Sequence, residues 1–194
     1  MVQPRSIGRH ATGFDTVHPM RDAVDPVDGC FGEAWAGTVP DGSHINLVIA
    51  RRGSPTAGAA ATAFATPGPG HSPVMACLGA GNAVRPATIV LNKATIASDL
   101  HGRITWGAAQ LGIAAGVMDC VADGVLSSAD ADDLVILVAV WVDPQAADET
   151  AVRAANRAAV RRAVEDALTT DRSARIRELL DLRDGATNAF YSGR

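Results

Sequence analysis

The pattern of hydrophobic and polar residues predicts strands most clearly in two stretches of this chain. In residues 44–49, Ile45, Leu47 and Ile49 alternate with the other positions, which predicts a strand with one buried face. Its apolar residues occupy the core side, and His44 and Asn46 therefore lie together on the opposite face. The nearly continuous apolar run 134–142 predicts a central strand covered on both faces, which Pro144 ends.

Two further strands are predicted between these stretches, at residues 74–78 and 88–96. The second contains Lys93 and Thr95, which are two positions apart and should share one face of the strand. A short apolar piece at 33–37 comes before the Pro-Asp-Gly turn that introduces the strand at 44–49.

Helical periodicity alternates with these strands. Ser54 is a good N-cap for a helix that begins with Pro55. This first helix, over residues 55–65, is rich in alanine. Apolar residues recur every three or four positions in the helices predicted at 104–123 and 146–168, and residues 171–183 could add one more amphipathic helix. This order favours an α+β fold, a mixed sheet with helices packed against it.

The chain divides into three parts that differ in their hydrophobic pattern. Residues 1–29 lack a sustained period and are predicted to be a flexible N-terminal extension. Residues 30–170 form the domain, and residues 171–194 form a C-terminal helical tail. His10 and His18 of the extension are interpreted as solvated residues, with a weak metal role as the alternative.

Composition narrows the class of function. Hydrophobic residues make up 47% of the 194 positions and charged residues 20%, as in a folded globular domain. The net charge of −4 and the absence of a basic cluster argue against a nucleic-acid partner. No apolar run approaches the ~20 residues of a membrane span, and the N-terminus lacks a signal-peptide core, so a cytoplasmic protein is expected. Three scattered cysteines, Cys30, Cys77 and Cys120, do not form a disulfide framework.

Common catalytic signatures are missing. There is no dinucleotide fingerprint, Walker loop, nucleophile elbow or zinc spacing, and no metal is expected. The Gly-Ala-Gly sequence at 79–81 is read as a turn, and the acidic run 130–133 as a solvated cap rather than a cation site. What remains is a set of polar residues on otherwise apolar elements, namely His44, Lys93, Thr95 and Gln110. Taken alone, His44 could be structural, and Lys93 could pack its stem while its ammonium reaches water.

At these residues the sequence resembles the formaldehyde-activating enzyme family. Six blocks carry the likeness, in register from Phe31 to about Val164. They are Gly32-Glu33-Ala34-Trp35-Ala36-Gly37, Ser43-His44-Ile45-Asn46-Leu47, Arg52-Gly53-Ser54-Pro55, Asn92-Lys93-Ala94-Thr95-Ile96, Trp106-Gly107-Ala108-Ala109-Gln110 and Asp130-Ala131-Asp132-Asp133-Leu134. The resemblance implies the family's fold, which is ribosomal protein S5 domain 2-like.

The resemblance also implies site residues. His44 matches the family's catalytic histidine, a proton donor. The positions that match its substrate contacts are Asn46, Met75, Lys93, Thr95 and Gln110. Asn46 departs from the family pattern, which has aspartate there. The final helix departs as well, with Ala155-Asn156-Arg157-Ala158 where the family has Tyr-Asn-Tyr-Glu.

What the resemblance implies for function is a lyase of one-carbon metabolism that condenses formaldehyde with a reduced pterin, tetrahydromethanopterin or a relative, as co-substrate. No covalently bound cofactor, nucleic acid or membrane is implied, and the family's homopentamer places pockets between subunits. We expect His44, Lys93, Thr95 and Gln110 to meet around one hollow, within a subunit or across a subunit contact. The alternatives are a weakly catalytic or non-catalytic pterin- or folate-binding protein on the same scaffold, which Asn46 would favour, and a structural oligomer component.

Overall fold

A computed structural model describes residues 26–186 of the chain. Its centre is one five-stranded mixed sheet with the strand order β1-β2-β5-β4-β3. The strands are β1 (Cys30–Ala36), β2 (Ser43–Arg51), β3 (Val74–Met75), β4 (Ala87–Asn92) and β5 (Leu134–Val142). Strands β4 and β5 are parallel, and every other neighbouring pair is antiparallel.

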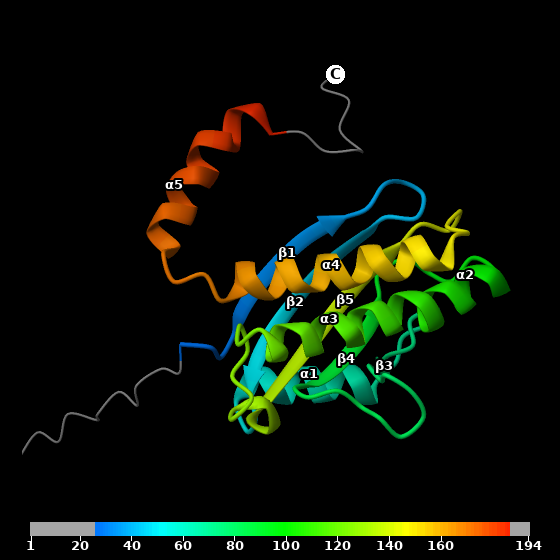
Figure 1. Cartoon of the computed structure of the whole chain (residues 1–194), viewed down its shortest axis with the longest axis horizontal. Coiled ribbons are helices and arrows are strands. Elements are labelled where there is room, and N and C mark those ends of the chain that lie inside the picture. Colours follow the sequence, from blue (N-terminus) through cyan, green and yellow to red (C-terminus); the bar gives the residue numbers. More distant parts are fainter. Residues whose placement is uncertain (1–25, 187–194) are drawn as a thin grey trace, which may run out of the picture.

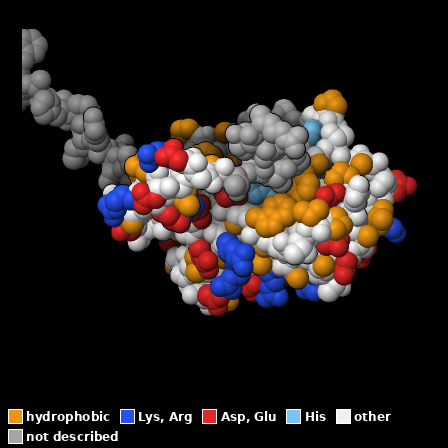
Figure 2. Space-filling view, turned by 90° about the horizontal axis from the view of Figure 1, so that it is seen from above, with side chains coloured by type: hydrophobic (Ala, Val, Ile, Leu, Met, Phe, Trp, Pro, Cys, Tyr) orange, Lys and Arg blue, Asp and Glu red, His pale blue; other side chains and the backbone are white. Residues whose placement is uncertain are grey.

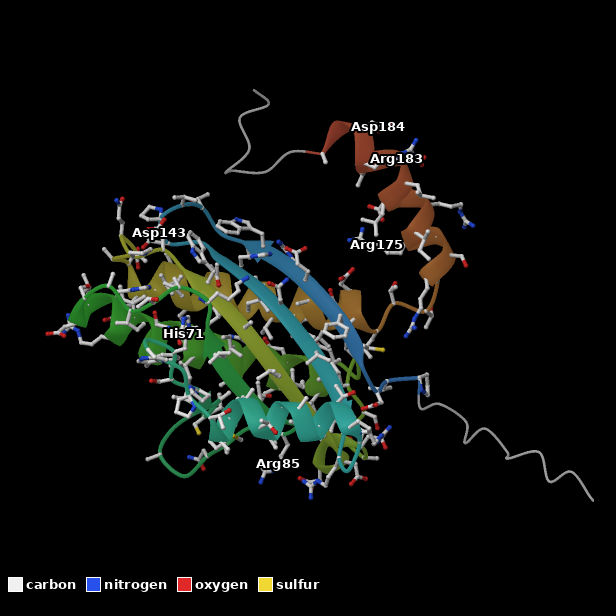
Figure 3. All side chains as sticks on the ribbon, turned by 180° about the vertical axis from the view of Figure 1, so that it is seen from behind. His71, Arg85, Asp143, Arg175, Arg183 and Asp184 are labelled. Atoms are coloured by element: carbon white, nitrogen blue, oxygen red, sulfur yellow. The ribbon has the colours of Figure 1, made fainter. Side chains whose placement is uncertain are left out.

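Helices cover the two faces of the sheet unequally (Figure 1). The helical elements are α1 (Pro55–Ala65), α2 (Asp99–Arg103), the π-helix η1 (Ile104–Ala109), α3 (Gln110–Ala122), the 3₁₀ turn η2 (Ala131–Asp133), α4 (Glu149–Ala167), α5 (Arg172–Leu182) and the 3₁₀ turn η3 (Arg183–Gly185). Helices α3 and α4 lie side by side across one face. On the other face, α1 crosses one end of the sheet and leaves the rest without a helix (Figure 3). The predicted α+β architecture is confirmed.

The core lies between the sheet and α3 and α4, and small residues let these layers approach closely. A Cβ atom added at Gly112 of α3 would stand 2.3 Å from the carbonyl oxygen of Arg153 in α4. At Gly32 of β1, an added Cβ would stand 1.9 Å from the carbonyl oxygen of Ala163. Close backbone contact thus replaces large side chains, in keeping with an aromatic content of 4%.

The long helix begins earlier than predicted. Ser98 caps it by accepting a hydrogen bond from the His101 amide, and the helix then continues through η1 into α3. The resulting helix, Asp99–Ala122, is long and apolar enough by composition alone to cross a membrane. The sequence did not predict this, because no uninterrupted apolar run approaches that length. Half of its most apolar window is buried within the fold, as in the core helix of a globular domain.

Three strand predictions need correction. The strand predicted at 74–78 is shorter, since β3 covers only Val74–Met75. The piece at 33–37 belongs to a full strand, β1, whose buried positions are small residues and therefore give a weak hydrophobic signal. The strand predicted at 88–96 ends at Asn92 as β4, so Lys93 and Thr95 follow the strand and do not share a face within it. The Asn92 side chain stabilises a change of backbone direction there, because its amide donates to the carbonyl oxygens of Gly70 and Ala94.

Other predictions agree more closely. The helix at 55–65 and the strand at 134–142 have the expected bounds, although β5 is fully buried only on its helix-covered face. The tail helix is present as α5, which extends away from the body of the fold and has no buried residue. Cys30 and Cys120 are buried free thiols, and Cys77 is half-buried. His10 and His18 lie outside the described residues.

Candidate active site

The strand pairing places an aromatic and charged cluster on the sheet face that α1 leaves open. Trp35 of β1 and Trp141 of β5 stand opposite His44 of β2, one on each side. The ring centroids of Trp35 and His44 are 6.3 Å apart, and those of Trp35 and Trp141 are 5.6 Å apart. Figure 2 shows a face of the molecule on which hydrophobic side chains gather beside histidine side chains.

His44 has a partner on each ring nitrogen. Lys93 Nζ lies 2.7 Å from Nδ1 of the ring, and Nε2 contacts the carboxylate of Glu33. An ammonium can only donate, so Nδ1 is the acceptor and Nε2 carries the proton that it donates to Glu33. Both partners therefore fix one tautomer and one orientation of the ring, which remains about one third exposed.

Lys93 reaches this cluster from the other side of β5. Its backbone amide donates to Val140 of β5 just after β4 ends, and its ammonium also donates to Oδ1 of Asn46 at 2.8 Å. Ala139, a small residue, lies opposite Asn46 in β5. Burial lowers the pKa of Lys93, and the negative charge of Glu33 raises it in part. Three of the expected site residues, His44, Asn46 and Lys93, are thus brought together.

Met75 lies on the sheet face that carries the cluster, whereas Thr95 lies beyond the end of β4. Thr95 is exposed and packs against Gly70, because the turn at Asn92 redirects the chain. Met75 pairs with Ile89, and Ile89 pairs with Leu137 of β5. Met75 therefore lies on the face that carries His44, where it is half-buried. Within residues 26–186, no hydrogen bond joins either side chain to the imidazole.

Gln110 occupies a different site, on the helix-covered side of the sheet. Its side-chain amide donates to the carbonyl oxygen of Cys77 at 2.9 Å. It lines a pocket of about 730 Å³ bounded by the 77–81 loop, η1 and the first turns of α4, with Arg103 and Arg153 at its walls. Within the described chain, Gln110 and His44 therefore do not face one hollow.

Sequence reasoning missed Glu33, Trp35 and Trp141 as members of the cluster. The turn at 40–42 was a signal for their position, because it indicates that the segments before and after it pair as antiparallel strands. That pairing puts Trp35 opposite His44 and Glu33 opposite Asn46. That pairing was not anticipated because the inward residues of β1 are glycine, alanine and cysteine.

The segment of the final helix that departs from the family pattern has structural partners, both at Asn156, which the pattern retains, and at Arg157, which departs from it. Asn156 is fully buried and accepts a hydrogen bond from the Ser43 hydroxyl at 2.8 Å, which ties α4 to β2. Arg157 makes two hydrogen bonds to the Asp119 carboxylate, at 2.6 and 2.7 Å. Arg157 holds the pKa of Asp119 below its ordinary value through these hydrogen bonds.

The other described histidines have structural roles. His101 is buried, accepts from the Ala97 amide through Nδ1 and donates to the Val142 carbonyl through Nε2. His71, labelled in Figure 3, contacts the Asn92 carbonyl through Nδ1. Among residues 26–186, no group of three or more histidine, cysteine or acidic side chains could hold a metal ion.

Comparisons with known proteins identify a family that the chain matches. The sequence profile of the formaldehyde-activating enzyme (Fae) matches residues 31–191. The chain is 36% identical over 159 residues to 5,6,7,8-tetrahydromethanopterin hydro-lyase of Methanosarcina barkeri, an alignment that covers 82% of this chain and 88% of that protein.

Longer relatives match over one part only. The chain is 31% identical over 137 residues to the bifunctional enzyme Fae/Hps of Methanosphaerula palustris, and 30% identical over 138 residues to that of Archaeoglobus fulgidus. Each alignment covers 71% of this chain and 35% of the relative, so the chain spans about a third of these bifunctional proteins. With the mixed sheet, the His44 cluster and a match over most of its length, this chain belongs to the formaldehyde-activating enzyme family.

Proposed function

We propose that this protein is a hydro-lyase that condenses formaldehyde with tetrahydromethanopterin or a related reduced pterin to give the methylene adduct. Family membership and the name of the Methanosarcina barkeri relative support this reaction. The observation that carries the proposal is the imidazole of His44, held between Lys93 and Glu33 on an open sheet face.

His44 is proposed as the general acid. Formaldehyde adds to one pterin nitrogen to give a carbinolamine, whose hydroxyl group leaves only after it takes up a proton. A histidine can supply that proton near neutral pH. In this site the Lys93 ammonium can give a new proton to the ring at Nδ1. The second pterin nitrogen then closes the ring of the product by attacking the iminium carbon.

Substrate positioning is proposed for the remaining matched residues. Asn46 and Lys93 offer an amide and an ammonium beside His44, Met75 lies on the same face of the sheet, and Thr95 follows Lys93 by two residues. Trp35 and Trp141 add aromatic surface for a flat pterin ring. Asn46 provides no negative charge where the family has aspartate, so a different pterin or a slower turnover is expected.

A neighbouring subunit is proposed to complete the site. Gln110 lies on the helix-covered side of the sheet, whereas His44 lies on the other side. One ligand can contact both only if Gln110 of one subunit approaches His44 of another. A homo-oligomer with pockets between subunits, which we propose to be a pentamer in the cytoplasm, satisfies this requirement.

The test is the pterin-dependent consumption of formaldehyde with and without the protein, compared with the spontaneous reaction. We expect acceleration that the His44→Ala variant reduces by about a hundredfold or more, as for loss of a general acid. An undiminished rate in this variant would overturn the assignment of His44. Pterin affinity without acceleration would indicate the binding-protein alternative, and no affinity at all would indicate a structural role.

A further inference from the structure

Lys93 is the only lysine in the whole sequence. The chain has 17 basic residues, and the other sixteen are arginines. Formaldehyde adds to neutral primary amines, whereas an arginine guanidinium stays protonated at all physiological pH values and is a poor nucleophile. Besides the α-amino group, the single amine of this chain therefore lies inside the candidate active site.

The surroundings of Lys93 make its ammonium easier to deprotonate than that of a lysine in water. Among residues 26–186, the hydrogen-bond acceptors of its ammonium are His44 Nδ1 at 2.7 Å and Asn46 Oδ1 at 2.8 Å, and neither carries the formal negative charge of an ion-pair partner. Burial lowers the pKa of Lys93, and the Glu33 carboxylate, which contacts the far nitrogen of His44, opposes this effect only in part. Asn46 matters here because an aspartate at its position would hold the ammonium as an ion pair.

We propose that Lys93 is a nucleophile that captures formaldehyde covalently and passes its carbon to the reduced pterin. The transfer step rests on the proposed function, but the capture step does not, because it needs only formaldehyde. Desolvated lysines that lose their proton easily are the amines that proteins use to form Schiff bases.

The capture step balances with the groups present. The Lys93 ammonium gives a proton to Nδ1 of His44, and the freed lone pair of Nζ forms a bond to the formaldehyde carbon. The carbonyl oxygen takes that proton from His44, which gives a carbinolamine. Nζ of the carbinolamine then gives a second proton to Nδ1 of His44, which passes it to the hydroxyl group, and the hydroxyl group leaves as water. One ammonium and one formaldehyde thus yield one iminium ion and one water.

The transfer step returns the amine. A pterin nitrogen attacks the iminium carbon, and its proton passes to the site. The second pterin nitrogen then displaces Nζ from that carbon, which breaks the bond to Lys93 and closes the five-membered ring. Nζ of Lys93 takes up the two protons released by the two pterin nitrogens and leaves as the original ammonium, and no oxidant or reductant is consumed.

The experiment traps the iminium ion by reduction. The full-length protein is incubated with isotopically labelled formaldehyde and cyanoborohydride without pterin, and N-methyl-lysine is located by peptide mass spectrometry. The Arg177→Lys variant supplies an internal reference, because Arg177 is exposed on α5 and its side chain makes no hydrogen bond or ion pair with any residue of 26–186. At neutral pH we expect Lys93 to be methylated at least about tenfold faster than the lysine of that variant.

Two further variants define the role of Lys93. His44→Gln should slow methylation of Lys93 by about tenfold, because the proton acceptor at Nδ1 is lost. Lys93→Arg keeps the positive charge but cannot form an imine, and its pterin-dependent rate should fall to near the spontaneous level. Methylation of Lys93 no faster than the reference lysine, or a full pterin-dependent rate in Lys93→Arg, would overturn the proposal. Rapid methylation without any pterin product would retain the capture step and contradict the proposed function instead.

Discussion

Nζ of Lys93 lies 2.7 Å from Nδ1 of His44, although the two residues are 49 positions apart in the sequence. The contact spans β5, the central strand, and it joins an amine that burial pushes toward its neutral form to a ring that can accept its proton. This pair makes His44 and Lys93 one chemical unit, so that a change beside either residue should alter the behaviour of both.

Glu33→Gln should lower the pKa of Lys93 further. The Glu33 carboxylate is the attraction that raises this pKa against the effect of burial, so its loss leaves burial less opposed. The rate of reductive methylation of Lys93 should therefore reach its midpoint at a lower pH than in the unsubstituted protein. A midpoint that stays in place or moves upward would show that Glu33 exerts no field at the amine.

Asn46→Asp should have the opposite effect. The new carboxylate would stand where Oδ1 of Asn46 now accepts from the ammonium, and it would stabilise the charged form of Lys93. A rise of about one unit in the pKa of Lys93 would slow its methylation at neutral pH about tenfold. Asn82→Asp, an exposed substitution in the 79–82 turn, adds the same charge without a contact to Lys93 and should leave the methylation rate unchanged.

Mixed oligomers test whether neighbouring subunits share a site. His44→Ala and Gln110→Ala damage opposite sides of the sheet, and each variant on its own should lose most of its pterin-dependent rate. When the two variants are unfolded together and reassembled, some interfaces should pair an intact His44 with an intact Gln110, and activity should return. Mixtures no more active than the sum of their components would contradict a site built from two subunits.

Gly112→Ala should strongly destabilise the fold. The new methyl group would stand 2.3 Å from the Arg153 carbonyl oxygen, so α3 and α4 would have to separate. We expect a loss of about 1–3 kcal/mol or more in the free energy of unfolding, measured by chemical denaturation. Gly58→Ala in α1 is the matched control, since nothing lies within 4 Å of its added Cβ, and it should stabilise the protein by about 0.5–1 kcal/mol.

The ion pair between Arg157 and Asp119 should make a small, pH-dependent contribution to stability. The pKa of Asp119 is lower in the folded state, so the contribution is present above its unfolded pKa and disappears as the pH falls through the folded value. Because Arg157 is half exposed, Arg157→Leu should lose less than about 1 kcal/mol at neutral pH. The difference in the free energy of unfolding between the two proteins should vanish in acid; a difference that persists there would mean that packing, not charge, is what Arg157 contributes.

Local patterns in the sequence were sufficient for the elements whose ends are marked by neighbouring residues. Strand β5 and helix α1 have the predicted bounds, because an apolar run ended by proline and a Ser-Pro helix start are both signals carried by neighbouring residues. The same kind of signal fails for β1, whose buried side is made of small residues that fit against α4. Likewise the end of β4 depends on the contacts of Asn92 with Gly70, 22 positions away.

The sequence by itself determined the fold class and the shared strand face of His44 and Asn46, since these follow from hydrophobic period and spacing, and it determined the family likeness through the six matched blocks. Only the tertiary structure decided which side chains meet there. Strand pairing brought Glu33 and Trp35 to His44, and the path of the chain after β4 brought Lys93 across β5. Such contacts depend on register and on turns between distant segments, which no local pattern specifies.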